Sequence, residues 1–172
     1  AFLVYLRMYA SGLAFMLYTS TYKFKKISRI IGALAYAFNG YALSTGLHHP
    51  FFILPLIFFP LLCYGIDRIM LNKSWIPLAV AVFLTLFANF YFAWILAIGS
   101  FVYVVIRMLS RRKATDFYFW RSIAKMAGSV VLGLGMSALV FLPTALFATK
   151  STRINQAFAN GMTFFAPEYY LK

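Results

Sequence analysis

The sequence is dominated by five long stretches that contain no charged residue and are strongly apolar. They cover residues 8–22, 30–47, 51–66, 76–106 and 126–149. A helix needs about 20 mostly apolar residues to cross a hydrocarbon layer about 30 Å thick. Short runs of basic residues separate the stretches. This pattern predicts an all-α, polytopic bundle of transmembrane helices.

Composition excludes a soluble domain. Charged residues make up 11% of the chain and apolar residues 63%, whereas a soluble domain carries about 25% charged residues. The net charge of +13 would suit a nucleic-acid partner. However, the positive charges flank apolar stretches, as expected for the loops of a membrane protein. We therefore expect the lipid bilayer, and no nucleic acid, as a partner.

The stretch 76–106 decides the number of crossings. As one helix, its 31 residues would be about 46 Å long, which exceeds the hydrocarbon thickness. As a hairpin turning near Asn89, it leaves twelve basic residues on one side of the membrane and four on the other, against nine and seven for a single span. Cytoplasmic loops are enriched in Lys and Arg, so the hairpin is favoured.

We therefore predict about six crossings, with the C-terminal tail outside the cytoplasm. The predicted crossings are residues 4–22, 30–47, 51–67, 76–88, 91–107 and 126–147. Residues 1–149 form the transmembrane region, and residues 150–172 begin an extracytoplasmic segment. Pro55 and Pro60 should kink or break the third crossing. Ser129, Gly133 and Ser137 are four residues apart, which places three small side chains on one face where another helix can approach closely.

Several polar residues have both a structural and a functional interpretation. Arg7 can snorkel to the outer interface or bind a lipid phosphate or pyrophosphate. His48 and His49 can cap a loop or contact a headgroup. Asn39 and Asn89 can satisfy backbone groups at helix ends or bind substrate. We expect the structural role for both asparagines.

Metal and acid–base chemistry have little support in the sequence. With one cysteine, Cys63, and two adjacent histidines, no metal site and no cofactor are expected. The acidic residues are Asp67 and Asp116, predicted inside, and Glu168, predicted outside. Asp67 should pair with neighbours or water. A general base outside the membrane would usually be a carboxylate. Either Glu168 serves as this base or the base lies in another part of the protein, and we expect the second, so the catalytic residue stays unknown.

An ordered series of short motifs resembles the YfhO-like family of large bacterial multipass membrane proteins. The series is AYAFNGY at 35–41, HPFF at 49–52, PLL at 60–62, GIDR at 65–68, NFYFA at 89–93, LPT at 142–144 and STR at 151–153. The resemblance implies a glycosyltransferase-like protein of the GT-C architecture in the bacterial cytoplasmic membrane. Such a protein passes a sugar from a polyprenyl-phosphate-linked donor to a cell-envelope polymer such as lipoteichoic acid on the outer face.

Motif matching selects four candidate substrate-binding residues: His49, Asn89, Tyr91 and Arg153. Arg7 is a fifth candidate because of its place at the outer end of the first crossing. GT-C enzymes typically carry a catalytic acidic residue in their first outer loop, and the two outer loops within these 149 residues contain none. Two other functions remain open. A transporter would typically show internal repeats and ionisable residues near mid-membrane, and a non-catalytic scaffold of a glycosylation complex is the third possibility.

Overall fold

The computed structural model describes residues 2–110 and 116–149, and in this part of the chain helices are joined by short turns and loops, with no strand. Seven α-helices and one 3₁₀ helix follow one another along the chain. They are α1 (Phe2–Thr19), α2 (Lys26–Ala37), α3 (Gly40–His48), η1 (Pro50–Ile53), α4 (Leu54–Met70), α5 (Ile76–Ala88), α6 (Phe90–Ser110) and α7 (Asp116–Thr149). The fold is all-α and polytopic, as the sequence predicts.

Four segments of the described residues are long and apolar enough to cross a membrane. They are Phe2–Thr19, Pro50–Met70, Phe90–Ser110 and Phe119–Leu139. Their outward side chains are large and apolar; Leu139 is 85% exposed and Phe101 70% exposed. Such surfaces would be costly in water and are favourable against lipid. α5 is apolar but has 13 residues, so the count of six crossings stays a prediction.

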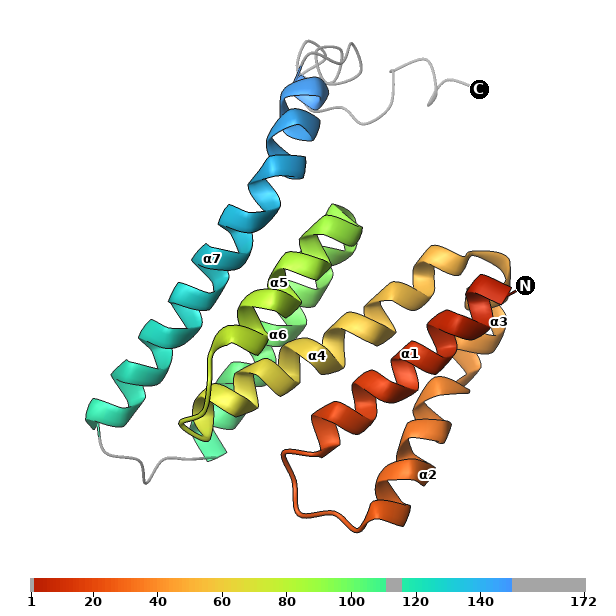
Figure 1. Ribbon diagram of the computed structural model, residues 1–172, viewed down its shortest axis with the longest axis horizontal. Helices are drawn as coiled ribbons and strands as arrows, with labels where there is room; N and C mark the ends of the chain where they lie inside the picture. Colours follow the sequence, from red (N-terminus) through yellow and green to blue (C-terminus); the bar gives the residue numbers. More distant parts are fainter. Residues whose placement is uncertain (1, 111–115, 150–172) are drawn as a thin grey trace, which may run out of the picture. The chain divides into compact units, whose positions relative to one another are not determined.

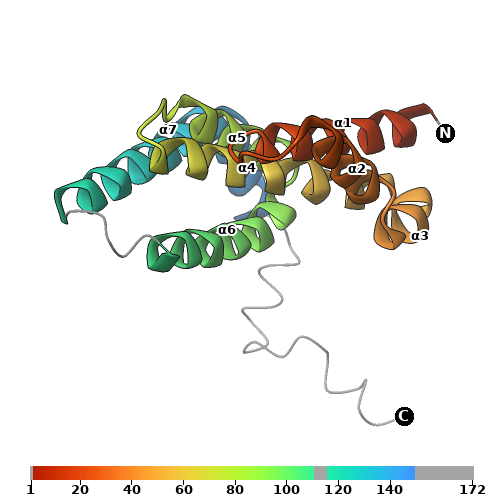
Figure 2. The ribbon, with the colours of Figure 1, turned by 90° about the horizontal axis from the view of Figure 1, so that it is seen from below.

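The chain divides into two compact units, residues 1–137 and 138–172. In the first unit, α4 packs against α1, α5 and α6, and α1 also packs against α2 (Figures 1 and 2). In the second unit, the described residues are 138–149, which are helical and include Pro143.

Two clusters of buried side chains form the core of the first unit. The larger cluster joins α4, α5, α6 and α7 through residues such as Ile66, Leu78 and Met126. The smaller one joins α1, α3 and η1, where Ala42 and Ile53 are fully buried. Gly65 allows α4 to approach α5 closely, because a Cβ atom built there would lie 2.6 Å from the Cα of Leu78.

Contacts at both ends of α1, α4 and α6 fix their relative direction. Near their starts, Arg7 contacts Phe51, and Phe52 contacts Phe92. Near their ends, Asp67 is bonded by Thr21 and Arg107. The three helices are therefore parallel, and the chain returns through α2–α3 and through α5. The turn at Asn89 is present, because α5 ends at Ala88 and α6 begins at Phe90 and runs back from the turn (Figure 1).

The stretch predicted to cross at 30–47 is two helices rather than one. The chain breaks between Ala37 and Gly40, and Asn39 satisfies both helix ends. Its Nδ2 donates to the carbonyl of Tyr36 at 2.7 Å, and its Oδ1 accepts from the amide of Ala42 at 2.8 Å. A side chain that bonds the backbone locally competes with helical hydrogen bonding. The structural role expected for Asn39 is confirmed.

Two other expectations about helices need correction. α4 continues through its prolines, so the expected break does not occur: Pro55 lies in the first turn, where its missing N–H has no helical partner, and Pro60 lies inside the helix, where a kink stays a prediction. α7 begins at Asp116, ten residues before the predicted crossing, and includes Arg121 and Lys125. Long basic side chains can extend to the interface and so do not require the helix to end.

The predicted small-residue face of α7 is confirmed. Ser129 and Ser137 are buried, and the Ser129 hydroxyl is 3.2 Å from the carbonyl oxygen of Trp75 at the start of α5. A Cβ atom at Gly133 would lie 2.7 Å from Cγ1 of Val82 and 2.9 Å from the carbonyl oxygen of Ala79. α7 therefore approaches α5 at a distance that only glycine permits here.

Two glycine substitutions on α7 test this packing. We expect Gly133→Ala to destabilise the protein by about 1–3 kcal/mol, because the added methyl group meets backbone. Gly135→Ala is the matched control, since a Cβ there meets nothing within 4 Å, and helix propensity should make it neutral or stabilising by up to about 1 kcal/mol. The midpoint of thermal unfolding of the purified full-length protein measures both. Equal midpoints for the two variants would contradict the close approach.

Candidate functional site

Four of the five candidate residues lie at one end of the first unit, where α1, α4 and α6 begin. Arg7 is on α1, His49 precedes η1, and Asn89 and Tyr91 are at the start of α6. Three phenylalanines, Phe51, Phe52 and Phe92, connect them. We call these seven residues the aromatic end. Arg153 lies outside the described residues.

Arg7 is the cation of the aromatic end. Its guanidinium carbon lies 5.2 Å from the centre of the Phe51 ring, within the range of a cation–π interaction. Its Nη1 atom is buried and has no hydrogen-bond partner among the described residues. A buried N–H group without a partner is energetically costly, and for a charged group the cost is greater. Arg7 can thus donate a hydrogen bond to an anionic or carbonyl oxygen that the described residues do not supply.

Two other arginines show how Arg7 differs. Arg29 and Arg68 also have a buried Nε atom without a partner in the described part of the chain. However, Arg29 donates from Nη2 to the carbonyl of Met16 at 2.8 Å, and Arg68 donates from Nη1 to the hydroxyl of Tyr64 at 3.2 Å. For Arg7, the described contact is the Phe51 ring alone. This makes Arg7 the strongest ligand-binding candidate of the three.

Aromatic rings extend from Arg7 toward α6. Phe52 packs edge-on against Phe92 with ring centres 5.4 Å apart, and the His49 ring is 5.8 Å from Phe52. On α6, Tyr91 packs edge-on against Phe92 at 5.6 Å. His49 is exposed, and Tyr91 is 68% exposed. The aromatic end therefore presents a cation, an imidazole, a phenol and several ring faces within a connected set of contacts.

Asn89 caps the start of α6. Its Oδ1 accepts hydrogen bonds from the amides of Tyr91 at 2.9 Å and Phe92 at 3.4 Å, and its own backbone is extended. This is the geometry of a helix N-cap, which satisfies amides that have no partner within the helix. The structural role expected for Asn89 is confirmed. The His48 side chain also contacts its own helix: its Nδ1 lies 2.8 Å from the carbonyl oxygen of Ser44, one turn earlier in α3.

Substitution of Asn89 separates capping from binding. We expect Asn89→Ala to lower the free energy of unfolding by about 0.5–2 kcal/mol, while Asn89→Asp keeps a capping oxygen and stays close to the wild type. Thermal unfolding of the purified full-length protein measures this difference. If Asn89→Asp were as unstable as Asn89→Ala, the side chain would contribute something other than the cap.

A second polar cluster lies where α1, α4 and α6 end, and its centre is Asp67. The carboxylate is fully buried. Arg107 donates from Nε to Oδ1 at 2.7 Å, and Tyr103 and Thr21 donate to Oδ2 at 2.9 and 3.2 Å. Asp67 is therefore paired, but with residues distant in the sequence rather than with the adjacent Arg68, which bonds the hydroxyl of Tyr64.

Three tyrosine hydroxyls extend the Asp67 cluster. Those of Tyr18, Tyr22 and Tyr103 form a triangle with edges of 3.1 to 3.2 Å. Tyr103 has one hydroxyl proton, and the carboxylate is the stronger acceptor, so Tyr103 donates to Asp67. The protons of Tyr18 and Tyr22 then serve two of the three edges of the triangle. Arg107 also lies over the Tyr22 ring, 5.3 Å from its centre.

Sequence reasoning did not identify these tyrosines. The available signal was their spacing: Tyr18 and Tyr22 are one helical turn apart, as are Tyr103 and Arg107, so each pair shares a face. The cluster satisfies its own charge and both carboxylate oxygens. The Asp67 cluster therefore has a structural role, which is to hold α1, α4 and α6 together. The aromatic end is the better candidate for ligand binding.

Comparison with known proteins gives the family. The family described as "Bacterial membrane protein YfhO" matches residues 1–171. The chain belongs to the YfhO family. It is also 31% identical over 112 residues to a protein of Bacillus subtilis (strain 168) named "Uncharacterized protein YfhO".

The match to this YfhO relative covers 65% of the chain and 13% of the relative, so the chain spans a small part of that protein's length. No solved structure matches the chain. Membership of the YfhO family and the four long apolar helices make this chain part of a bacterial membrane protein. Among the described residues, no group of three or more His, Cys, Asp or Glu side chains is placed to hold a metal ion.

Proposed function

We propose that the full-length protein is a GT-C-type membrane glycosyltransferase. It takes a sugar from a polyprenyl-phosphate donor and transfers it to a cell-envelope polymer such as lipoteichoic acid. The reaction takes place at the outer face of the cytoplasmic membrane, and the aromatic end contributes to the donor site. The observation that carries the proposal is the unpartnered, buried Nη1 of Arg7 at the start of a membrane-spanning helix.

Each residue of the aromatic end has a role that its chemistry suits. Arg7 binds a phosphate oxygen of the donor, because the planar guanidinium makes strong charge-assisted hydrogen bonds to phosphate. The exposed rings of Tyr91 and Phe51 provide apolar faces against which the sugar packs. His49, also exposed, hydrogen-bonds a sugar hydroxyl or the phosphate. Asn89 holds the start of α6, and so Tyr91, in position.

The general base is assigned to another part of the full-length protein. Sugar transfer to a hydroxyl requires a group that accepts its proton, and a carboxylate commonly does so. Asp67, the carboxylate whose side chain is described, is at the other end of α4 and is fully bonded. The chain spans 13% of the Bacillus subtilis relative, which leaves most of the protein to supply the base and the acceptor site.

Reconstitution of the full-length protein tests the proposal. Vesicles containing the purified protein receive a polyprenyl-phosphate donor with a radiolabelled sugar, together with lipoteichoic acid. We expect label to move from the lipid to the polymer. Movement of the intact labelled lipid across the bilayer would instead identify a transporter. If the label neither moved to the polymer nor crossed the bilayer, the protein would be a non-catalytic scaffold. The transporter result and the scaffold result would each overturn the proposal.

A further inference from the structure

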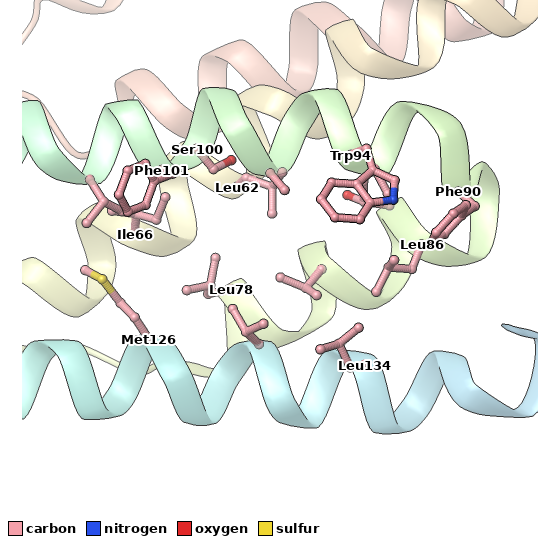
Figure 3. Close-up of a pocket in the computed structure, with 16 residues that line it drawn as sticks. Leu62, Ile66, Leu78, Leu86, Phe90, Trp94, Ser100, Phe101, Met126 and Leu134 are labelled. Atoms are coloured by element: carbon pink, nitrogen blue, oxygen red, sulfur yellow. The ribbon is translucent and has the colours of Figure 1, made fainter. Parts of the chain in front are cut away.

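An apolar pocket lies within the first unit, between α6 and α7, with α4 and α5 forming its other walls (Figure 3). Its volume is about 440 Å³, within the usual range of small-molecule sites. Sixteen residues line it, and their side chains are apolar except for Thr85, Ser100 and the indole nitrogen of Trp94. The aromatic end does not contribute to it. The pocket is therefore separate from the proposed donor site.

The shape of the pocket fits a hydrocarbon chain. Along α6 the lining runs from Phe90 to Val104, a length of about 21 Å at 1.5 Å per residue. A volume of 440 Å³ spread over that length is a narrow slot. A helix is about 10–12 Å across with its side chains and would not enter it. A single flexible hydrocarbon chain would, and the surrounding bilayer supplies such chains.

Basic residues lie next in sequence to the elements that form one end of the pocket. Met126 lines this end, and the adjacent Lys125 donates from Nζ to the side-chain oxygen of Asn72 at 3.2 Å. Lys73 and Arg121 lie close by in the chain and are exposed. The described partner of Lys125 is the neutral side-chain amide of Asn72. The Asp67 carboxylate does not neutralise Lys125, because it is paired with Arg107. An anionic group next to Lys125 would complement this charge.

We propose that the pocket binds one acyl chain of an anionic phospholipid, with the phosphate next to Lys125. The slot receives the hydrocarbon, and the ammonium of Lys125 binds the headgroup at the membrane surface. A cation near the surface of the bilayer attracts anionic lipid in this way. The bound lipid fills a space between α6 and α7 that the described side chains leave empty. This role does not depend on sugar transfer.

Photocrosslinking tests the proposal with the full-length protein in lipid nanodiscs. The probes are phosphatidylglycerol and phosphatidylcholine, each with a photoreactive group midway along one acyl chain. We expect the anionic probe to label the α6 peptide at Trp94 and Ala97 and the α7 peptide at Val130 and Leu134. Its labelling should exceed that of the neutral probe by about fivefold, the factor expected for one surface cation. Lys125→Gln should remove this preference.

Variants that fill the slot provide the control. Ala97→Phe and Leu134→Phe come from opposite walls, and either should abolish pocket labelling. Ile98→Phe is the matched control, because Ile98 is 63% exposed and does not line the pocket. Size-exclusion chromatography identifies variants that remain folded. We expect Ile98→Phe to leave pocket labelling unchanged. The proposal would be overturned by unchanged labelling in a folded Ala97→Phe or Leu134→Phe protein, or by a loss of labelling in Ile98→Phe equal to theirs. Displacement of the anionic probe by polyprenyl phosphate would also overturn it.

Discussion

Replacing Arg107 with methionine should destabilise the full-length protein by about 3–5 kcal/mol. The substitution leaves the Asp67 carboxylate, which is fully buried, without the guanidinium that bonds Oδ1 at 2.7 Å. Removing one partner of a buried ion pair costs more than removing both, because the remaining charge has no compensation. The measurement is the midpoint of thermal unfolding, monitored as the fraction of protein that remains monodisperse after heating.

The double variant tests this explanation directly. Asp67→Leu combined with Arg107→Met removes both charges and should recover most of the lost stability. Arg68→Met is a matched control from the same part of α4; this arginine bonds the phenol of Tyr64 rather than a carboxylate, so its loss should cost about 1 kcal/mol or less. If the double variant were less stable than Arg107→Met, the stability of the Asp67 cluster would depend on the tyrosine triangle rather than on the ion pair.

Replacing Arg7 with methionine should reduce sugar transfer about 10- to 100-fold, the factor that corresponds to roughly 1.5–3 kcal/mol for a hydrogen bond to a charged group. The side chain keeps its apolar contact with Phe51 and loses the N–H groups that we propose bind the donor phosphate. Arg7→Lys keeps the charge without the planar fork and should retain intermediate activity. Initial rates with the radiolabelled donor measure the effect.

Lys25→Met is the control for Arg7. It also removes one positive charge, but from an exposed position just before α2. We expect normal transfer from this variant. Unfolding midpoints of Arg7→Met and the wild type should agree closely, because the Nη1 of Arg7 has no described hydrogen bond to lose. Normal transfer by a folded Arg7→Met protein would remove Arg7 from the donor site.

The helices follow from the sequence because a backbone in hydrocarbon must satisfy its own hydrogen bonds. Long apolar stretches therefore predict α1, α4 and α6 well. The break at Asn39 was not predicted, because hydropathy records how apolar a side chain is and not which backbone groups it bonds. The early start of α7 was not predicted either, because Arg121 and Lys125 were treated as loop residues although basic side chains are tolerated near helix ends.

The candidate site was predictable in its parts and not in its arrangement. Asn89 as a cap follows from an asparagine between two apolar segments. The contact between Arg7 and Phe51 depends on how α1 packs against α4, and the bond between Asp67 and Arg107 joins residues 40 positions apart. Neither distance is encoded in local spacing. The tyrosines of the Asp67 cluster became evident only when three helices were placed together.

The central claim is that the aromatic end faces the outside of the cell, where a lipid-linked donor is used. Labelling of single cysteines in the full-length protein tests it most directly. Tyr91→Cys places a thiol at an exposed position of the aromatic end, and Lys25→Cys places one at an exposed position where α1 has ended. With a membrane-impermeant maleimide, we expect Tyr91→Cys to react in intact cells and Lys25→Cys to react only after lysis. The reverse pattern would contradict the account.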